Sequence, residues 1–221
     1  MRTDSRLLPT QTKSIFWMRV RYWSQARTRN SWQLKTDDTA TTLNCSRTEL
    51  MTSEKMRFGF WPNPRSDYES TKILAQHAEA TGWDGIWLAD HFLPEEDALI
   101  PVHESWITMA ALARDVPRVR LGTLVAGNTY RHPAVLANMV STLDNLAEGR
   151  VVLGLGAGWQ QNEHDAYGIE YGTVGSRLDR LEEACQIIKG LFHTDHFSFN
   201  GQHYQLKNAP LEPKPLQAKI P

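Results

Sequence analysis

The sequence predicts an α/β fold built around a parallel β-sheet. Strand-like and helix-like segments alternate four times downstream of residue 56. Such strict alternation is typical of βαβ units, whose strands run parallel. The expected strands are apolar at nearly every position, as strands covered on both faces must be. A doubly wound open sheet and a closed barrel both satisfy these observations.

The first unit is expected to begin with a strand at residues 56–61, which Pro62 ends. Asp67 is a good helix-capping residue, and Gly82 is a good residue to end that helix. The helix face expected to pack inward consists of Ile73, Leu74, His77 and Ala78.

Three further units follow the same pattern. Their strands are expected at residues 84–89, 119–125 and 150–156, and their helices at 104–115, 133–148 and 176–192. Pro133 suits the first position of its helix. Backbone N–H groups in the first turn have no acceptor within the helix, so proline, which has no N–H, loses no hydrogen bond there. Gly149 suits the end of the same helix.

Beyond the fourth helix, two alternating segments flank Asn200-Gly201, which predicts a β-hairpin. A proline-rich stretch at residues 210–221 follows, and we expect it to lead toward a fifth strand. Four units are half of an eight-unit barrel of ~250 residues. We therefore expect a barrel truncated after about four units. On this interpretation the chain alone is weakly stable or self-associating, and inactive.

The composition is that of a soluble globular protein, with 41% apolar and 22% charged residues among 221. The net charge of −1 gives no reason to expect a nucleic-acid or membrane partner. Two cysteines without metal-ligand spacing indicate free thiols in a reducing cytoplasm. The sequence shows neither a transmembrane segment nor a secretory signal, so we expect a cytoplasmic location.

Residues 1–55 differ from the rest of the chain. They carry ten basic and five acidic side chains and lack a sustained apolar period. We interpret them as an extension without assigned function, ahead of a natural start at Met56. An organellar transit peptide and a nucleic-acid-binding arm are the alternatives, and Asp37 and Asp38 weaken the first of these.

The candidate functional residues lie where the expected strands end, because parallel α/β folds bind their ligands there. Asp90 and His91 follow the second strand, and an acid beside an imidazole suits proton transfer or hydrogen bonding to a polar ring. The alternative is that Asp90 caps the loop and His91 is buried and hydrogen-bonded. Arg131, beyond the third strand, is a candidate anion contact or part of a solvated loop.

The fourth strand ends in a glycine-rich segment, residues 154–159. It differs from the dinucleotide fingerprint of a Rossmann fold, because Trp159 replaces the last glycine and no acid follows at the required distance. We therefore exclude a Rossmann NAD site. Glu163 and His164 lack a third ligand, so no metal site is predicted. The absence of a nucleophile motif favours chemistry performed by a bound cofactor.

Several motifs in a fixed order resemble the luciferase-like monooxygenase superfamily, in its branch of probable F420-dependent oxidoreductases. The resemblance covers Met56 to Pro221. Its motifs are Ala89-Asp90-His91-Phe92, Leu121-Gly122-Thr123-Leu124-Val125, Tyr130-Arg131-His132-Pro133, Leu153-Gly154-Leu155-Gly156-Ala157-Gly158-Trp159, Glu163-His164, Tyr167-Gly168-Ile169, Arg177 with Leu181-Glu182-Glu183, and Phe199-Asn200-Gly201.

The resemblance implies a (β/α)8 TIM barrel that binds the deazaflavin F420, or FMN in related branches, where the strands end. It implies an organic small-molecule substrate and a homodimer. His91 would lie beside the cofactor ring as acid or base, with Asp90 next to it. Trp159 stands where some members carry a catalytic acid. The residues expected to bind the cofactor are Asp90, His91, Thr123, Leu124, Val125, Asn128, Gly158, Trp159 and Asn162.

Two of these positions have a further implied feature. Leu124 and Val125 match a bulge behind the ring, often with a cis peptide bond that does not involve proline.

The leading functional hypothesis is hydride transfer with F420 and an unknown organic substrate. An FMN-dependent monooxygenase of the same fold is the alternative within the family, and an inactive truncated remnant is the alternative of another class.

Overall fold

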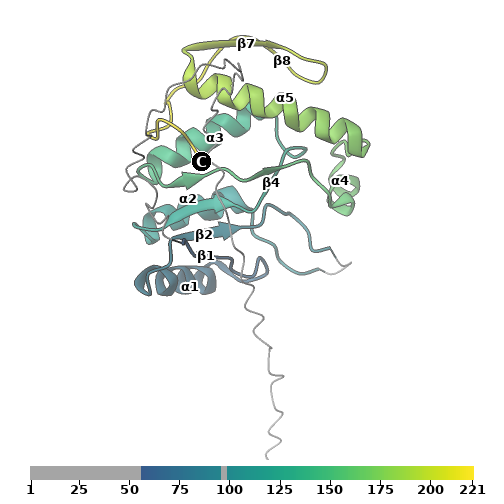
Figure 1. Ribbon diagram of the computed structural model, residues 1–221. Coiled ribbons are helices and arrows are strands. Elements are labelled where there is room, and N and C mark those ends of the chain that lie inside the picture. The colour runs from purple at the N-terminus through teal and green to yellow at the C-terminus, as the bar shows by residue number, and fades with distance from the viewer. Residues whose placement is uncertain (1–55, 96–98) are drawn as a thin grey trace, which may run out of the picture. The chain divides into compact units, whose positions relative to one another are not determined.

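The computed structural model describes residues 56–95 and 99–221. The basic segment at residues 1–55, interpreted above as an extension, lies outside the described residues. In the described part, strands and helices alternate as the sequence predicts (Figure 1). None of the helices in this part is long and apolar enough to cross a membrane.

The central sheet has four parallel strands in their order along the chain. They are β1 (Gly59–Phe60), β2 (Gly85–Leu88), β3 (Arg120–Thr123) and β5 (Val151–Val152). Connections between parallel strands are right-handed, so an order without reversal places all connecting helices on the same face. A doubly wound sheet requires a reversal of strand order, which these four strands lack. The wall of a barrel is therefore the architecture that fits.

The helices form one layer on this sheet. They are α1 (Tyr68–Ala80), α2 (Ser105–Asp115), α3 (Pro133–Leu146) and α5 (Val174–His193). Each packs against the next in this order, and Figure 1 shows them stacked from α1 at the bottom to α5 near the top. The bounds agree with the predicted helices to within a turn, because local capping signals mark their beginnings.

Those capping signals are visible in the structure. The Asp67 side chain accepts a hydrogen bond from the backbone N–H of Ser70 at 2.8 Å, as expected for the cap of α1. Pro133 occupies the first turn of α3, as predicted. Glu104 caps α2 in the same way, accepting from the N–H of Ile107 at 2.7 Å.

The face of α1 that packs inward is not the predicted one. Its buried residues are Thr71, Ala75 and Ala78, whereas Ile73 and Leu74 are exposed. His77 is exposed as well, so Ala78 is the one member of the predicted face that is buried. The large apolar side chains suggested the wrong face, because the small side chains are the ones that allow the helix to lie close to its neighbours.

The third and fourth predicted strands are each divided in two. After β3 the chain continues as β4 (Ala126–Gly127), and after β5 as β6 (Leu155–Gly156). The two extensions pair with each other in parallel, in a separate two-stranded sheet. Between β3 and β4, where the resemblance implied a bulge and a cis peptide bond, the peptide bond between Leu124 and Val125 is cis.

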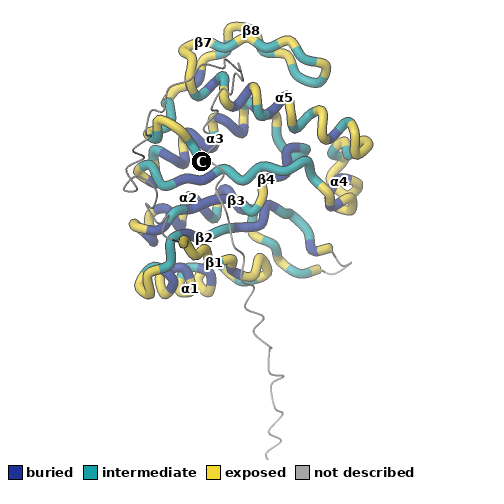
Figure 2. Tube along the Cα trace, in the orientation of Figure 1, coloured by how far each residue is buried: buried dark blue, intermediate teal, exposed yellow. Residues whose placement is uncertain are grey.

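The Trp87 indole covers the sheet where neighbouring strands carry glycine. A Cβ atom at Gly59 would lie 1.7 Å from the Trp87 Nε1, and one at Gly122 would lie 2.5 Å from its Cζ3. The two glycines therefore provide the space that this ring fills. Buried segments (dark blue in Figure 2) occur in both the sheet and the helices. The largest apolar side chains that are almost fully buried are those of Ile86, Met109, Leu112, Leu121, Leu136, Ile187 and Leu191.

The predicted hairpin follows α5. Its strands are β7 (His196–Asn200) and β8 (Gln205–Pro210), which pair in antiparallel fashion (top of Figure 1). Glu183 on α5 holds the turn, because its carboxylate accepts hydrogen bonds from three consecutive backbone N–H groups. The donors are Gln202, His203 and Tyr204, at 2.7, 3.0 and 3.0 Å.

Replacing Glu183 with alanine is expected to loosen this turn. Burial by itself would raise the pKa of Glu183, but the three N–H donors outweigh it and lower the pKa below the ordinary 4.5. The stabilisation is therefore complete above the ordinary value and is lost as the pH falls through the lowered one. Hydrogen exchange of the three turn amides should accelerate in the variant. Glu182→Ala, at the neighbouring exposed position, should leave them protected, and equal acceleration would contradict this role.

The proline-rich stretch at residues 210–221 packs back onto α3 and β5. The amide of Gln217 donates to Asp144 and to the Val151 carbonyl, both at 2.8 Å. The carbonyl of Pro221 accepts from the N–H of Leu153 at 3.1 Å. The stretch therefore reaches the edge of the sheet at β5.

Candidate active site

The centre of the candidate site is His91, directly after β2. Its Nδ1 lies 2.8 Å from the Oε1 atom of Glu163, on the short helix α4 (Gln161–Tyr167) that the sequence did not predict. The Glu163 side chain is fully buried, while His91 is 23% exposed. The Nε2 atom of His91 makes no hydrogen bond to the residues that the structure describes. The ring is thus fixed at one nitrogen and open at the other.

Glu163 accepts one further hydrogen bond, from the backbone N–H of Phe92 to its Oε2 at 3.2 Å. Burial, together with the nearby Glu163 carboxylate, raises the pKa of Tyr130 well above its usual range, so the hydroxyl stays protonated. Sequence reasoning missed both residues as part of the site, because Glu163 lies 72 positions from His91 and no local pattern connects them.

Glu163 and His164 are adjacent in sequence, but their side chains contact different partners. The His164 ring is buried and contacts the Gln160 carbonyl through Nδ1 and the Thr129 hydroxyl through Nε2. In the part of the chain that is described, no group of three His, Cys, Asp or Glu side chains could hold a metal ion. The side chains of Glu163 and His164 are both hydrogen-bonded to other groups of the protein.

The helix α4 is also attached to the loop after β2. Gln160 donates to the Leu93 carbonyl and Asn162 to the Pro94 carbonyl, each at 2.9 Å. Asn162 is one of the residues predicted to contact the cofactor, and its amide nitrogen is directed to this loop. These bonds hold the loop that carries His91 against the end of the fourth strand.

The side chain of Asp90, which the sequence predicts to take part in proton transfer, is engaged in structural contacts. Its side chain is fully buried and binds Arg131 through two hydrogen bonds, of 2.7 and 3.0 Å. It also accepts from the Ser105 hydroxyl and from the N–H of Gly127. Because its oxygens are all engaged, Asp90 ties the ends of β2 and β4 together and has no open position for a substrate proton.

The interpretation of Arg131 as an anion contact is wrong for the same reason. The guanidinium is 12% exposed, and besides Asp90 it binds Glu104 at 2.6 Å. Burial opposes its charge, but the two carboxylates outweigh this effect and raise the pKa of Arg131. The cation is neutralised within the fold.

The end of β3 carries the residues predicted to support a ring. The Thr123 hydroxyl is buried and donates to the Gly154 carbonyl at 2.7 Å. Val125, after the cis peptide, is 43% exposed. A Cβ atom at Gly154 or Gly156 would lie within 3.0 Å of the Val125 methyl groups. The glycines of the fourth strand therefore make room for Val125, whose remaining surface is open.

Trp159 lies next to the candidate histidine. It is 58% exposed, and its ring meets His91 edge to face at a centroid distance of 5.6 Å. The Tyr171 hydroxyl donates to the Trp159 carbonyl at 2.7 Å, and Arg177 donates to the carbonyl of Gly158 at 3.1 Å. Gly158 has a φ of +85°, which favours glycine. These two hydrogen bonds fix the backbone that carries Trp159.

Asn128, also predicted to bind the cofactor, is buried at the end of β4. Its amide nitrogen lies 3.5 Å from the Tyr204 hydroxyl of the hairpin, at the limit of a hydrogen bond. Its Oδ1 has no partner among the described residues. Asn128 is therefore a buried polar group that a ligand could satisfy.

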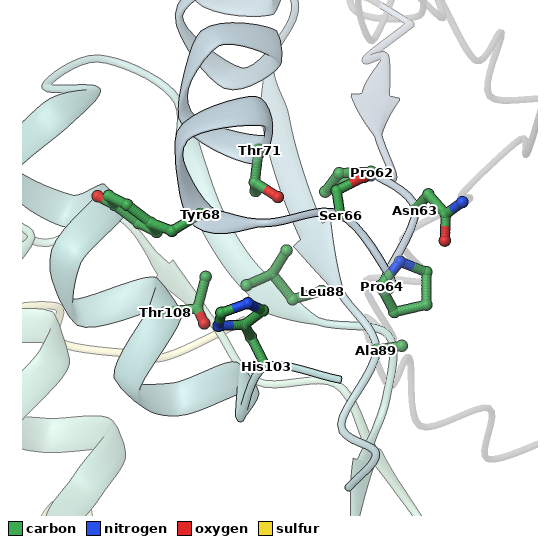
Figure 3. Close-up of a pocket in the computed structure, with 10 residues that line it drawn as sticks. All are labelled: Pro62, Asn63, Pro64, Ser66, Tyr68, Thr71, Leu88, Ala89, His103 and Thr108. Carbon is green, nitrogen blue, oxygen red and sulfur yellow. The ribbon is translucent and has the colours of Figure 1, made fainter. Parts of the chain in front are cut away.

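A small pocket lies beside the ends of β1 and β2 (Figure 3). In this view the His103 ring lies between Thr108 and Pro64, close to Leu88. None of the nine residues predicted to bind the cofactor lines this pocket. It is therefore distinct from the group around His91.

The motifs and their arrangement agree with a comparison against known families. A family model described as luciferase-like monooxygenase matches residues 42–221. The chain belongs to the luciferase-like monooxygenase family. The match confirms the resemblance drawn from the motifs. It begins upstream of Met56, and residues 42–55 lie outside the described part.

The curated relatives of this family member include F420-dependent dehydrogenases. The chain is 38% identical over 146 residues to the F420-dependent glucose-6-phosphate dehydrogenase of Amycolatopsis mediterranei, covering 65% of this chain and 43% of that protein. It is 34% identical over 148 residues to the F420-dependent hydroxymycolic acid dehydrogenase of Mycobacterium tuberculosis, covering 64% and 41%. The chain spans less than half the length of these relatives.

Solved structures similar to this chain include F420-dependent and FMN-dependent enzymes. An F420-dependent secondary alcohol dehydrogenase in complex with an F420-acetone adduct matches with a TM-score of 0.69 and 27% identity, over 75% of this chain and 50% of that one. The FMN-bound oxygenating component of the 3,6-diketocamphane monooxygenase from Pseudomonas putida matches with a TM-score of 0.57 and 21% identity, over 68% and 43%, a likeness of fold alone. The predicted TIM-barrel class is confirmed, and the described residues contribute four consecutive βα units.

Proposed function

We propose that this luciferase-like protein takes part in hydride transfer between F420 and an organic substrate that carries a hydroxyl or a carbonyl group. The observation that carries the proposal is His91, anchored by Glu163 and open at Nε2. The relatives named above support the cofactor. Their names refer to a sugar phosphate, a hydroxy acid and a secondary alcohol, which supports the substrate class.

The residues at the strand ends fit a flat aromatic cofactor. Val125 and Trp159 each expose a large part of an apolar side chain. Apolar and aromatic walls with a few polar groups are typical of cofactor pockets. Asn128 offers an amide oxygen that has no partner in the described residues, suited to an N–H group on a ring edge. We propose that these residues, with His91, would hold the deazaflavin ring.

In the proposed reaction, protein residues would transfer the proton, and the bound cofactor would serve as hydride acceptor or donor. F420, when bound, supplies a ring carbon that accepts or donates a hydride. When an alcohol is oxidised, Nε2 of His91 would take up the hydroxyl proton. When a carbonyl is reduced, the protonated His91 would return a proton to the carbonyl oxygen. Trp159, standing where some family members carry an acid, supplies no second proton donor, so His91 serves both directions.

Cofactor titration of the purified chain tests the proposal. We expect the fluorescence of F420 to change in a saturable way as the chain is added, and that of FMN to change less. His91→Ala should weaken F420 binding, whereas His77→Ala, at an exposed position on α1, should not. Saturable binding of FMN alone would favour the FMN-dependent monooxygenase. Binding of neither cofactor to the folded chain would favour the inactive remnant.

Turnover gives a second readout of the same role. Loss of a group that transfers a proton typically lowers a rate by about 10²–10⁴-fold. We expect this loss in kcat for His91→Ala, measured as alcohol-dependent reduction of F420, with the His77→Ala variant as the control. A variant without His91 that retains its kcat would contradict the assignment.

A further inference from the structure

We propose that Glu163 is a positioning residue that fixes the proton of His91 on Nδ1, so that Nε2 presents its lone pair to a ligand. The proposal rests on the proposed function only for its catalytic consequence. The placement of the proton itself follows from the hydrogen bonds around Glu163, and it can be measured without any cofactor.

The donors around the Glu163 carboxylate determine the direction of its bond to His91. A carboxylate only accepts hydrogen bonds, so Nδ1 must donate to Oε1 across the 2.8 Å contact. The N–H of Phe92, which donates to Oε2, is a backbone group and cannot change role. In the neutral imidazole, the proton on Nδ1 leaves Nε2 as the acceptor.

The adjacent histidine provides a built-in comparison. His164 also has a carbonyl acceptor at Nδ1, but its Nε2 is occupied by the Thr129 hydroxyl at 2.7 Å. Its ring is 1% exposed. The two histidines thus share a tautomer, and only His91 has a nitrogen available to a substrate. The tautomer of His164 does not depend on Glu163.

Replacing Glu163 with glutamine should reverse the tautomer of His91. The fixed N–H of Phe92 retains the single amide oxygen, because two donors facing each other would leave both unsatisfied. The amide NH₂ then faces Nδ1, which must become the acceptor, and the proton moves to Nε2. A histidine in the wrong tautomer cannot take up the substrate proton. A tautomer change of this kind lowers kcat by about 10⁴-fold in the histidine–carboxylate pair of a serine protease.

Nitrogen NMR of the chain with ¹⁵N-labelled histidine tests the proposal at a pH where both rings are neutral. The unmodified chain should show His91 protonated at Nδ1. Glu163→Gln should show it protonated at Nε2, with the His164 signals unchanged. Asp165→Asn, which neutralises an exposed acid on the same helix, should leave both rings unchanged. Protonation of His91 at Nε2 in the unmodified chain would overturn the proposal, even if the Gln variant failed to fold.

Two further results separate this inference from the proposed function. If Glu163→Gln folds and His91 keeps its proton on Nδ1, Glu163 does not position the ring, whatever the chain binds. If the tautomer reverses but the unmodified chain binds no F420, the positioning stands and the proposed function falls. Glu163→Asp, which keeps the charge but shortens the side chain by one methylene, should restore the Nδ1 tautomer at least in part.

Discussion

Replacing Arg131 with methionine is expected to lower the free energy of unfolding by about 3–5 kcal/mol. The guanidinium is the counter-ion of Asp90, whose side chain is fully buried at the ends of β2 and β4. Removing it leaves a negative charge without a cation in an environment that solvates ions poorly. Ser105 and the N–H of Gly127 remain as donors, but neither carries a charge. Chemical denaturation followed by circular dichroism would measure the loss.

An exposed ion pair provides the matched control. Arg114 and Glu148 lie 4.0 Å apart with side chains 72% and 82% exposed, so Arg114→Met should cost at most about 1 kcal/mol. Adding Asp90→Asn to the Arg131 variant should recover part of the loss, because it removes the unpaired charge. If Arg131→Met were as stable as Arg114→Met, the structural assignment of Asp90 would be wrong.

Replacing Gly122 with alanine is expected to cost about 2–3 kcal/mol or more. The new Cβ would lie 2.5 Å from the Cζ3 of Trp87 and 2.6 Å from the carbonyl oxygen of Val152. The carbonyl belongs to the paired strand β5, so it cannot retreat without disturbing the register between Gly122 and Val152. The free energy of unfolding, measured by denaturation, should therefore fall sharply.

Gly175 in α5 is the control for this substitution. A Cβ there would meet nothing closer than Thr173 Oγ1 at 3.8 Å, and alanine suits a helix better than glycine. Gly175→Ala should be neutral or stabilise the chain by about 0.5–1 kcal/mol. Adding Trp87→Phe should restore more of the stability lost by Gly59→Ala than of the stability lost by Gly122→Ala. Only the new Cβ at position 122 also meets a backbone atom, which the smaller ring leaves in place. Equal stability of the Gly122 and Gly175 variants would refute the close packing described for Trp87.

The elements that the sequence predicted well are those with local signals. Asp67 caps α1 and Pro133 begins α3, because capping depends on residues within one turn. The hairpin at residues 200–201 follows from its turn residues in the same way. The α1 face was predicted wrongly from Ile73 and Leu74. Which face a helix buries depends on the shape of the surface it meets, and that surface is built by distant parts of the chain.

The roles within the site follow the same division. The residues at the strand ends were found from the sequence, because polar groups after apolar strands mark that edge of a parallel sheet. Their partners were not. Asp90 meets Arg131, 41 positions away, and His91 meets Glu163, 72 positions away. No periodicity or motif encodes a contact between two loops whose strands are brought together only by the sheet.

The sequence by itself determined the class of fold, the order of its units, the family and the position of His91 at a strand end. Apolar runs, caps and turn residues act within a few positions, so they are legible along the chain. Only the tertiary structure decided that Asp90 is neutralised by Arg131 and that His91 is held by Glu163 with one nitrogen open. Those roles depend on which buried charges find partners, and burial and partnership exist only once the strands lie side by side.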